Sequence, residues 1–140
     1  MELLKLDDFP LKAFDKIRYG DTDRQGHINN ATFLTYLETG RVELIYHPDF
    51  RALDENNSFV IASVKLDFIK EIKWPGSIDI GTGIINIGNS SIRLHQQLFQ
   101  HDQCMASSET VIVQVNDQKG VSRPLSDRAK EALEKWIITV

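Results

Sequence analysis

One short run of the chain carries side chains that could perform acid–base or nucleophilic chemistry, with the order Tyr-Gly-Asp-Thr-Asp-Arg-Gln-Gly-His-Ile-Asn-Asn over residues 19–30. Asp21 and Asp23 are separated by one residue, and an apolar segment that predicts a helix begins directly after the run. The first turn of a helix has unpaired backbone N–H groups and a partial positive charge, which favour developing negative charge. A carboxylate beside such donors suits acyl transfer or hydrolysis.

Asp23 is open to two interpretations. Aspartate is common in turns and at helix caps, so a structural role is possible. Gly26, His27 and the asparagine pair that follow, with the helix behind them, favour a catalytic role instead. A carboxylate in this position could attack a thioester carbonyl or deprotonate a water molecule.

Asp21 and His27 lie close to Asp23 in the sequence and could share its role. On an extended segment Asp21 points to the same side as Asp23, and we expect it to be structural and to pair with Arg18 or Arg24. His27 could be an acid, a base or a metal ligand. Because no second His or Cys stands at a metal-ligand spacing, we expect no metal and a positioning role for His27.

The length, net charge and composition of the chain limit the classes of protein to which it can belong. A chain of 140 residues predicts a single domain over residues 1–140. The net charge of -4 argues against nucleic acid as a partner. The single cysteine, Cys104, cannot form an internal disulfide, no apolar run reaches the roughly 20 residues of a membrane span, and the N-terminus is too polar for a signal peptide. These features predict a cytoplasmic protein.

The apolar segment over residues 31–46 must position the candidate centre. Apolar or small residues recur there with helical spacing, and they are Phe33, Tyr36, Leu37, Gly40 and Leu44. Leu34, Val42 and Ile45 widen this surface, so we expect a helix that is buried on most sides. Asn29 or Asn30 is expected to cap its start, and Pro48 to close its end.

Glu38 lies within this helix and would be buried with it. A buried glutamate needs a partner, and Arg41 is three residues away, so the plain interpretation is a structural ion pair. The alternative is an acid that faces the substrate and has a raised pKa.

The remaining elements are predicted to be mostly strands. A first strand is expected over residues 14–19, long strands over 59–74 and 78–87, further strands over 92–98 and 110–115, and a last helix with Ser126 as its N-cap. No further helix is expected between the strands. This order predicts an α+β fold in which a curved sheet wraps one long helix. Such a sheet leaves open edges, so we expect a homodimer or a larger homo-oligomer.

The segment Arg18–Asn30, with Tyr36, Glu38 and Arg41 in the helix, resembles hot-dog-fold acyl-CoA thioesterases of the 4-hydroxybenzoyl-CoA thioesterase type. The element order extends the resemblance over nearly the whole chain. It implies a long central helix wrapped by a five-stranded antiparallel sheet, a short C-terminal helix and sites at a dimer interface. It also implies hydrolysis of an acyl thioester to a carboxylate and a free thiol, with coenzyme A as part of the substrate and no cofactor.

The resemblance also suggests roles for residues. Asp23 would be the nucleophile or general base, the helix start near Asn30 would supply the oxyanion N–H, and His27 would stand beside them. Substrate contacts would come from a further set, Gly26, Asn29, Tyr36 and Glu38.

The turn at residues 88–91 departs from the family pattern. Some relatives carry Arg or Lys there, against the phosphates of coenzyme A, whereas this chain has Ser90 and Ser91 with Arg93 just beyond. These three are the candidate coenzyme A contacts, and the choice between coenzyme A and an acyl carrier protein stays open.

Two other functions share this fold and stay open. A dehydratase or hydratase acting on enoyl-CoA would use an Asp and a His across the site, with Asp23 and His27 as candidates. A non-catalytic module for acyl carriers would keep the groove without the reaction.

Overall fold

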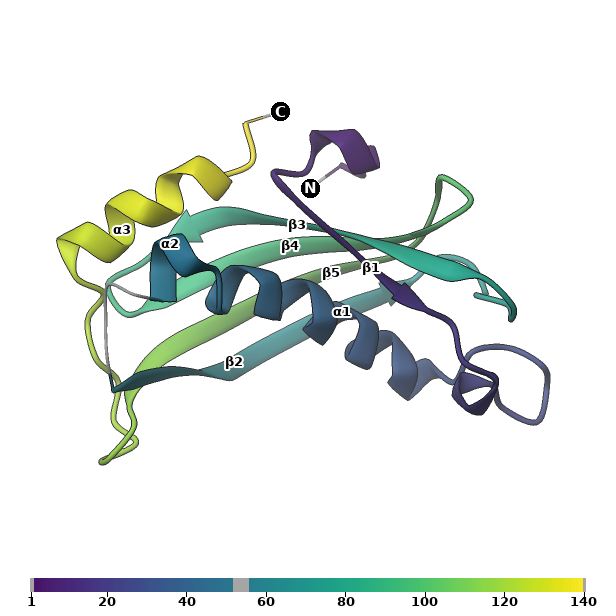
Figure 1. The fold of residues 1–140 in the computed structure, drawn as a ribbon, viewed down its shortest axis with the longest axis horizontal. Coiled ribbons are helices and arrows are strands. Elements are labelled where there is room, and N and C mark those ends of the chain that lie inside the picture. Colours follow the sequence, from purple (N-terminus) through teal and green to yellow (C-terminus); the bar gives the residue numbers. More distant parts are fainter. Residues whose placement is uncertain (1, 52–55, 140) are drawn as a thin grey trace.

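The computed structural model describes residues 2–51 and 56–139. Five antiparallel strands form one sheet in the order β1-β3-β4-β5-β2. The strands are β1 (Leu11–Lys16), β2 (Asn57–Phe68), β3 (Ser77–Ile87), β4 (Ser91–Gln100) and β5 (Gln103–Asn116). The helices are α1 (Asn30–Ile45), α2 (Pro48–Arg51) and α3 (Asp127–Leu133). The curved sheet runs behind α1, and α3 lies beyond one end of it (Figure 1), which confirms the predicted α+β arrangement.

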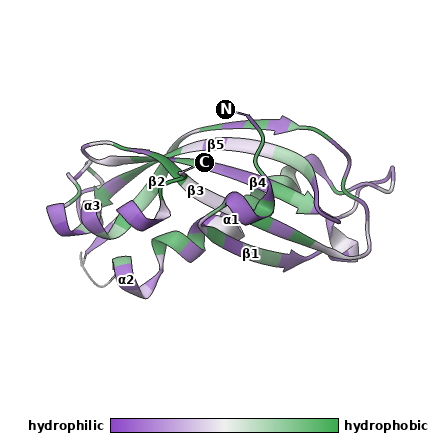
Figure 2. Ribbon diagram, turned by 90° about the horizontal axis from the view of Figure 1, so that it is seen from above, coloured by the Kyte–Doolittle hydropathy of each residue, from purple (hydrophilic) through white to green (hydrophobic). Residues whose placement is uncertain are grey.

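The helix α1 begins where the sequence predicts. Asn29 is its N-cap, and the Asn29 side chain accepts a hydrogen bond of 2.9 Å from the backbone N–H of Ala31. Apolar and polar residues both occur around its turns (Figure 2), and one face of the helix is buried against the sheet.

The expectation that α1 is buried on most sides is wrong for the single chain. Leu34 and Val42 are 44% and 37% exposed. The reason is that the sheet covers only one side of the helix, with contacts from β1, β3 and β4.

The core consists of two apolar clusters along this helix. One contains Phe33 and Tyr36 near the start of α1, and the other contains Leu44 near its end. Between them the helix approaches the sheet closely at Gly40, and the Gln96 side chain donates hydrogen bonds to the carbonyl of Leu37 (3.0 Å) and to the hydroxyl of Thr82 (2.9 Å).

Three predicted element boundaries need correction. The first strand covers Leu11–Lys16 rather than 14–19, because Tyr19–Asp21 form a 3-10 turn closed by the Asp21 carboxylate on the Arg18 N–H (3.0 Å). The strand predicted over 59–74 ends at Phe68, since the N–H groups of Ile69 and Lys70 both donate to the carbonyl of Met105. The strand predicted over 110–115 extends over Gln103–Asn116.

Pro48 does not simply end α1. It starts the short helix α2, where a proline at the first position is favoured because the missing N–H would be unpaired there. Ser126 caps α3 as predicted, accepting from the N–H of Ala129 at 3.1 Å. Within the described residues, no helix is long and apolar enough to cross a membrane.

Candidate active site

The acidic run forms a tight loop that is tied to the start of α1. Thr22 pairs with Ile28, the Asp23 N–H donates to the His27 carbonyl at 2.7 Å, and the Asn29 N–H donates to the Asp21 carbonyl at 2.9 Å. Gly26 adopts a left-handed φ of +86° at the tip, a conformation in which a side chain would be strained. The loop therefore holds its polar side chains in fixed positions against the helix start.

Asp21 anchors this loop to the core. Its Oδ2 accepts hydrogen bonds from the Arg18 N–H (3.0 Å) and the Tyr36 hydroxyl (2.8 Å). Burial and the adjacent Asp21 carboxylate raise the pKa of the Tyr36 phenol well above its usual value, so Tyr36 stays a donor. Arg18 Nε lies 3.8 Å from Asp21 Oδ2, so the predicted pairing with Arg18 is confirmed, and these contacts agree with a structural role. The extended backbone predicted for it is wrong, since Asp21 lies in the 3-10 turn.

Asp23 is half-buried and keeps one carboxylate oxygen available. Its Oδ1 accepts from the N–H groups of Gln25 (2.9 Å) and His27 (3.2 Å). Among the described residues Oδ2 has no hydrogen-bond partner. The two backbone donors fix the orientation of the carboxylate, and the second oxygen can meet a water molecule or a carbonyl carbon.

A pocket of about 330 Å³ contains this carboxylate. Asp23, His27 and Asn30 all line it, so the structure brings the three predicted catalytic residues together. Asn30 is the first residue of α1, where backbone N–H groups lack partners within the helix. A carboxylate and a helix start therefore face the same small volume.

Several residues that line this pocket were not predicted from the sequence to be part of the site. They come from the end of β2 and the segment after it, and they are Phe68, Ile69, Lys70 and Glu71. Glu71 lies 3.1 Å from His27 (Oε2 to Nε2), so a carboxylate orients the histidine ring. A charged pair at the end of an apolar strand was the one local signal, but its pairing with residue 27 depends on the tertiary fold.

The predicted substrate contacts separate into different places. Gly26 and Asn29 lie in the loop and at the helix cap. Tyr36 is fully buried in the core, and its contact is with Asp21. Glu38 lines a second and larger cavity between α1 and β2 instead.

The predicted ion pair between Glu38 and Arg41 does not form. Glu38 is exposed, Arg41 is 5% exposed, and no ion pair within 4 Å joins Arg41 to a carboxylate in the described part of the chain. Residues three apart on a helix differ by about 60° around its axis. Here that rotation turns Arg41 toward the sheet and leaves Glu38 at the surface.

The candidate coenzyme A contacts lie far from Asp23 within one chain. The turn that carries Ser90 and Ser91 joins β3 to β4 at the end of the sheet beside α3, and the Asp23 loop is at the other end (Figure 1). Arg93 pairs with Glu109 at 2.6 Å on the exposed side of the sheet. These three residues remain candidates only if the ligand reaches them from a neighbouring chain.

Among the described residues, no group of three or more His, Cys, Asp or Glu side chains could hold a metal ion. The Asp21 carboxylate is turned toward Tyr36, and His27 is turned toward Glu71. The arrangement is thus a carboxylate, an oriented histidine and a helix start around one pocket.

Comparison with known proteins gives consistent results. The profile of the thioesterase-like superfamily matches residues 17–136. The uncharacterized protein YsmA of Bacillus subtilis is 26% identical over 119 residues, which cover 84% of this chain and 80% of that protein. The acyl-CoA thioesterase YbgC of Helicobacter pylori is 29% identical over 84 residues, covering 60% of this chain and 63% of that enzyme. A crystal structure of a Thermus thermophilus thioesterase complexed with coenzyme A and Zn is 27% identical, with a TM-score of 0.81 over 91% of this chain and 93% of that one.

Proposed function

The chain belongs to the thioesterase-like superfamily and has its hot-dog fold, and we propose on this basis that it hydrolyses acyl thioesters of coenzyme A to a carboxylate and free coenzyme A. The Helicobacter pylori relative is named as an acyl-CoA thioesterase, which supports this reaction. The observation that carries the proposal is the Asp23 carboxylate, whose Oδ2 accepts no hydrogen bond from the described residues and shares a pocket with the start of α1.

The reaction needs one attacking oxygen and one oxyanion site. Asp23 Oδ2 either attacks the thioester carbonyl carbon, giving an anhydride that water then opens, or takes a proton from a water molecule that attacks instead. In both routes the carbonyl oxygen gains negative charge next to the N–H of Asn30 and the positive end of α1. The C–S bond then breaks and the thiolate leaves. In the first route this step forms the anhydride, and the water that later hydrolyses it supplies the proton for the thiolate. In the second route the Asp23 carboxyl group passes to the thiolate the proton that it took from water.

His27 and Lys70 support this centre in different ways. His27, oriented by Glu71, borders the pocket and positions the loop through its backbone bonds to Asp23. Lys70 lines the same pocket and is exposed, and we propose it as a contact for the anionic part of coenzyme A. The proposed hydrolysis uses no metal and no cofactor.

We propose that the active form is a homodimer that pairs β2 with β2 of a second copy. β2 is an edge strand of 12 residues, and Val60, Ile61, Val64 and Phe68 on it are 39% to 52% exposed. A long apolar edge that is left open invites pairing with another chain. We place this dimer in the cytoplasm, in keeping with the single cysteine.

A panel of acyl-CoA esters tests the function. Release of free thiol from saturated acyl-CoA esters is the expected result. Hydration of an enoyl-CoA ester without thiol release would instead indicate the dehydratase, and binding of esters with neither reaction would indicate an acyl-carrier module. Either of these two outcomes would refute the thioesterase.

A further inference from the structure

Arg41 is a buried cation without a partner in the described part of the chain. The residue is 5% exposed, and its Nη1 has no hydrogen-bond partner and almost no solvent contact. Burial lowers the pKa of Arg41 from its usual value, and the negative charge of Glu38 opposes this shift. Glu38 is therefore close enough to act through its field but does not bond the guanidinium.

A buried guanidinium without an acceptor is unfavourable in a protein interior. A buried charge costs free energy unless it is paired and hydrogen-bonded, and unpaired N–H donors add to that cost. Proteins usually satisfy buried guanidinium groups with carboxylate or carbonyl oxygens. Because the described residues supply no acceptor to Arg41 Nη1, a group from outside them can take this position.

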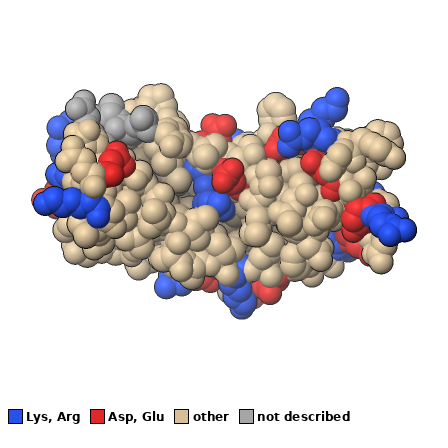
Figure 3. Space-filling model, turned by 90° about the horizontal axis from the view of Figure 1, so that it is seen from below, with Lys and Arg blue, Asp and Glu red and all other residues tan. Residues whose placement is uncertain are grey.

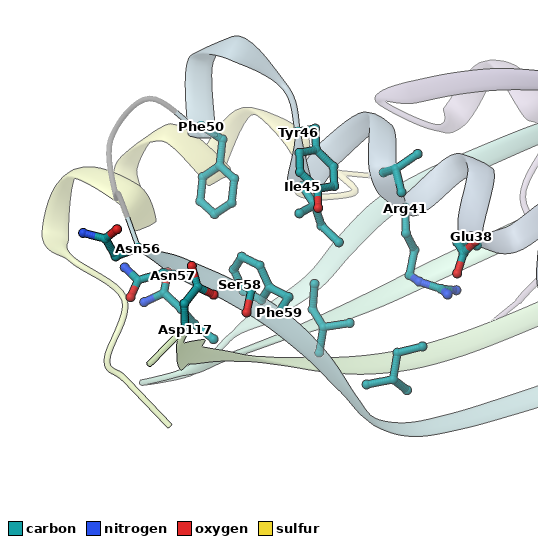
Figure 4. A pocket seen from close by; sticks show the side chains of 14 residues that line it. Glu38, Arg41, Ile45, Tyr46, Phe50, Asn56, Asn57, Ser58, Phe59 and Asp117 are labelled. Atoms are coloured by element: carbon teal, nitrogen blue, oxygen red, sulfur yellow. The ribbon is translucent and has the colours of Figure 1, made fainter. Parts of the chain in front are cut away.

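Arg41 also lines the larger of the two pockets described above. The cavity between α1 and β2 has a volume of about 720 Å³, within the range of small-molecule sites. Its middle is apolar, with Ile45, Phe50 and Phe59 from three different elements. Figure 4 shows Arg41 reaching down from α1 at one end of the cavity, while Asn57 and Asp117 stand at the other end.

The strand β2 connects this cavity with the catalytic pocket. Ser58, Phe59 and Ile61 near its start line the cavity, and Phe68 at its end lines the Asp23 pocket. Antiparallel pairing of β2 with β2 of a second copy would place the start of one strand beside the end of the other. The cavity of one copy would then continue the Asp23 pocket of its partner.

We propose that this cavity receives the acyl group of the substrate, and that the Arg41 guanidinium binds an oxygen acceptor at the far end of that group. The inference rests on the proposed thioesterase function for the identity of the ligand as an acyl group. It names the substrate class as acyl chains with a distal carboxylate or hydroxyl rather than plain alkyl chains. A guanidinium fork matches a carboxylate in geometry and charge, so the dicarboxylic acyl group is the best fit.

The first test measures binding of free acids, which needs no catalysis. Calorimetric titration compares adipate, 6-hydroxyhexanoate and hexanoate on the wild type, on Arg41→Met and on the control variant Arg128→Met, whose arginine is exposed on α3. We expect adipate to bind at least about tenfold more tightly than hexanoate, and this preference to vanish only in Arg41→Met. A smaller preference for 6-hydroxyhexanoate would show that a neutral acceptor also binds.

The second test uses the matching esters, adipoyl-CoA and hexanoyl-CoA. The ratio of their kcat/KM values should favour adipoyl-CoA in the wild type and fall at least about tenfold in Arg41→Met. Hydrolysis of both esters with an unchanged ratio in Arg41→Met overturns this inference and leaves the thioesterase standing. Selective binding of adipate that depends on Arg41, without hydrolysis of any ester, would support the Arg41 site and refute the thioesterase.

Stability gives an independent readout of the unpaired charge. Replacing an unpartnered buried cation by an apolar side chain of similar length should not lower the melting temperature of the ligand-free protein. A clear fall in the melting temperature of Arg41→Met would mean that Arg41 has a structural partner, which contradicts the proposal. Should that variant fail to fold, Arg41→Lys keeps the charge but loses the fork, and the adipate preference should still fall several-fold.

Discussion

Asp21 and Asp23 show how two identical side chains two residues apart take different roles. Asp21 is satisfied by the Tyr36 hydroxyl and a backbone N–H, so its carboxylate holds the loop. Asp23 uses one oxygen for backbone donors and presents the other to a pocket at a helix start. The hydrogen-bond partners, rather than the residue type, distinguish the structural carboxylate from the candidate catalytic one.

A surface carboxylate gives a residue-scale prediction for pH. Arg93 lowers the pKa of Glu109 below its ordinary value of 4.5, and their side chains are 2.6 Å apart and 49% and 40% exposed. A lowered pKa in the folded state adds stability above the ordinary pKa, and this contribution is lost as the pH falls through the folded-state value. Because the pair is exposed, Arg93→Gln should cost no more than about 1 kcal/mol at pH 7.

Urea unfolding at several pH values checks this. The difference in unfolding free energy between wild type and Arg93→Gln should be present at pH 7 and disappear well below pH 4.5. Arg128→Gln, an exposed change on α3, serves as the control and should show no such dependence. A difference that grows toward acid pH would contradict the assigned sign.

The run of residues 19–30 predicts part of the site because these residues are close together in the sequence. The carboxylate, the histidine and the helix start fall within one loop and one cap, so turn and cap chemistry places them. Glu71 and Lys70 were not predicted, because only the pairing of distant segments brings them to His27. The Glu38–Arg41 pair was predicted wrongly, because spacing along a helix does not tell which side chain faces the sheet.

At the scale of elements, α1 and the sheet meet most closely at Gly40. A Cβ there would lie 2.5 Å from Ile80 Cγ2 and 2.8 Å from both Gln96 Nε2 and Thr82 Oγ1. The glycine therefore allows the helix to approach the strands while Gln96 bonds the carbonyl of Leu37. This contact holds the middle of α1 in place over the sheet.

Gly40→Ala should destabilise the protein. Alanine gains about 1 kcal/mol over glycine in a helix. The steric conflict with Ile80 and the lost bonds of Gln96 outweigh this gain, with a net loss of about 1–2 kcal/mol. Thermal and chemical unfolding measure the difference.

Gly20→Ala is the matched control. A Cβ at Gly20 meets nothing within 4 Å, so the change should stay within about 0.5 kcal/mol of the wild type. Equal effects at Gly20 and Gly40 would refute the close approach as the reason for the glycine.

The elements themselves were largely predictable, and their ends less so. Ser126 and Asn29 give clear cap signals, and both caps are present. The strand β1 was placed three residues too late because Asp21 folds the following segment into a 3-10 turn. The helix α2 was not predicted, because a proline after a helix usually indicates the end of that helix. A proline can also be the first residue of the next helix, as Pro48 is here.

For the whole molecule, the exposed edge of the sheet is the main unexplained surface. β2 forms the lower border of the sheet in Figure 1, and the view from below shows wide uncharged areas between small mixed groups of acidic and basic side chains (Figure 3). Both the apolar edge and the cavity that Arg41 and β2 line are consistent with a second copy at this border. The dimer was expected from the open edges alone.

Val64→Asp should break this dimer. A charge in the middle of an edge strand opposes pairing with another strand, and Val64 is 39% exposed in the single chain. Sedimentation velocity should show a dimer for the wild type and a monomer for Val64→Asp. Phe14→Asp, on the opposite edge strand β1 and 75% exposed, should remain dimeric. A Val64→Asp variant that stays dimeric would place the interface elsewhere.

The most direct test of the account is the single-turnover rate of thioester hydrolysis by Asp23→Asn. Asparagine keeps the Oδ1 that accepts from Gln25 and His27 but removes the charge from the second position, so the fold should be preserved. We predict a fall in rate of about 10²- to 10⁴-fold with unchanged circular dichroism, while Asp102→Asn in an exposed turn behaves as wild type. A folded Asp23→Asn protein that hydrolyses its best ester within a few-fold of the wild-type rate would contradict the catalytic role of this carboxylate.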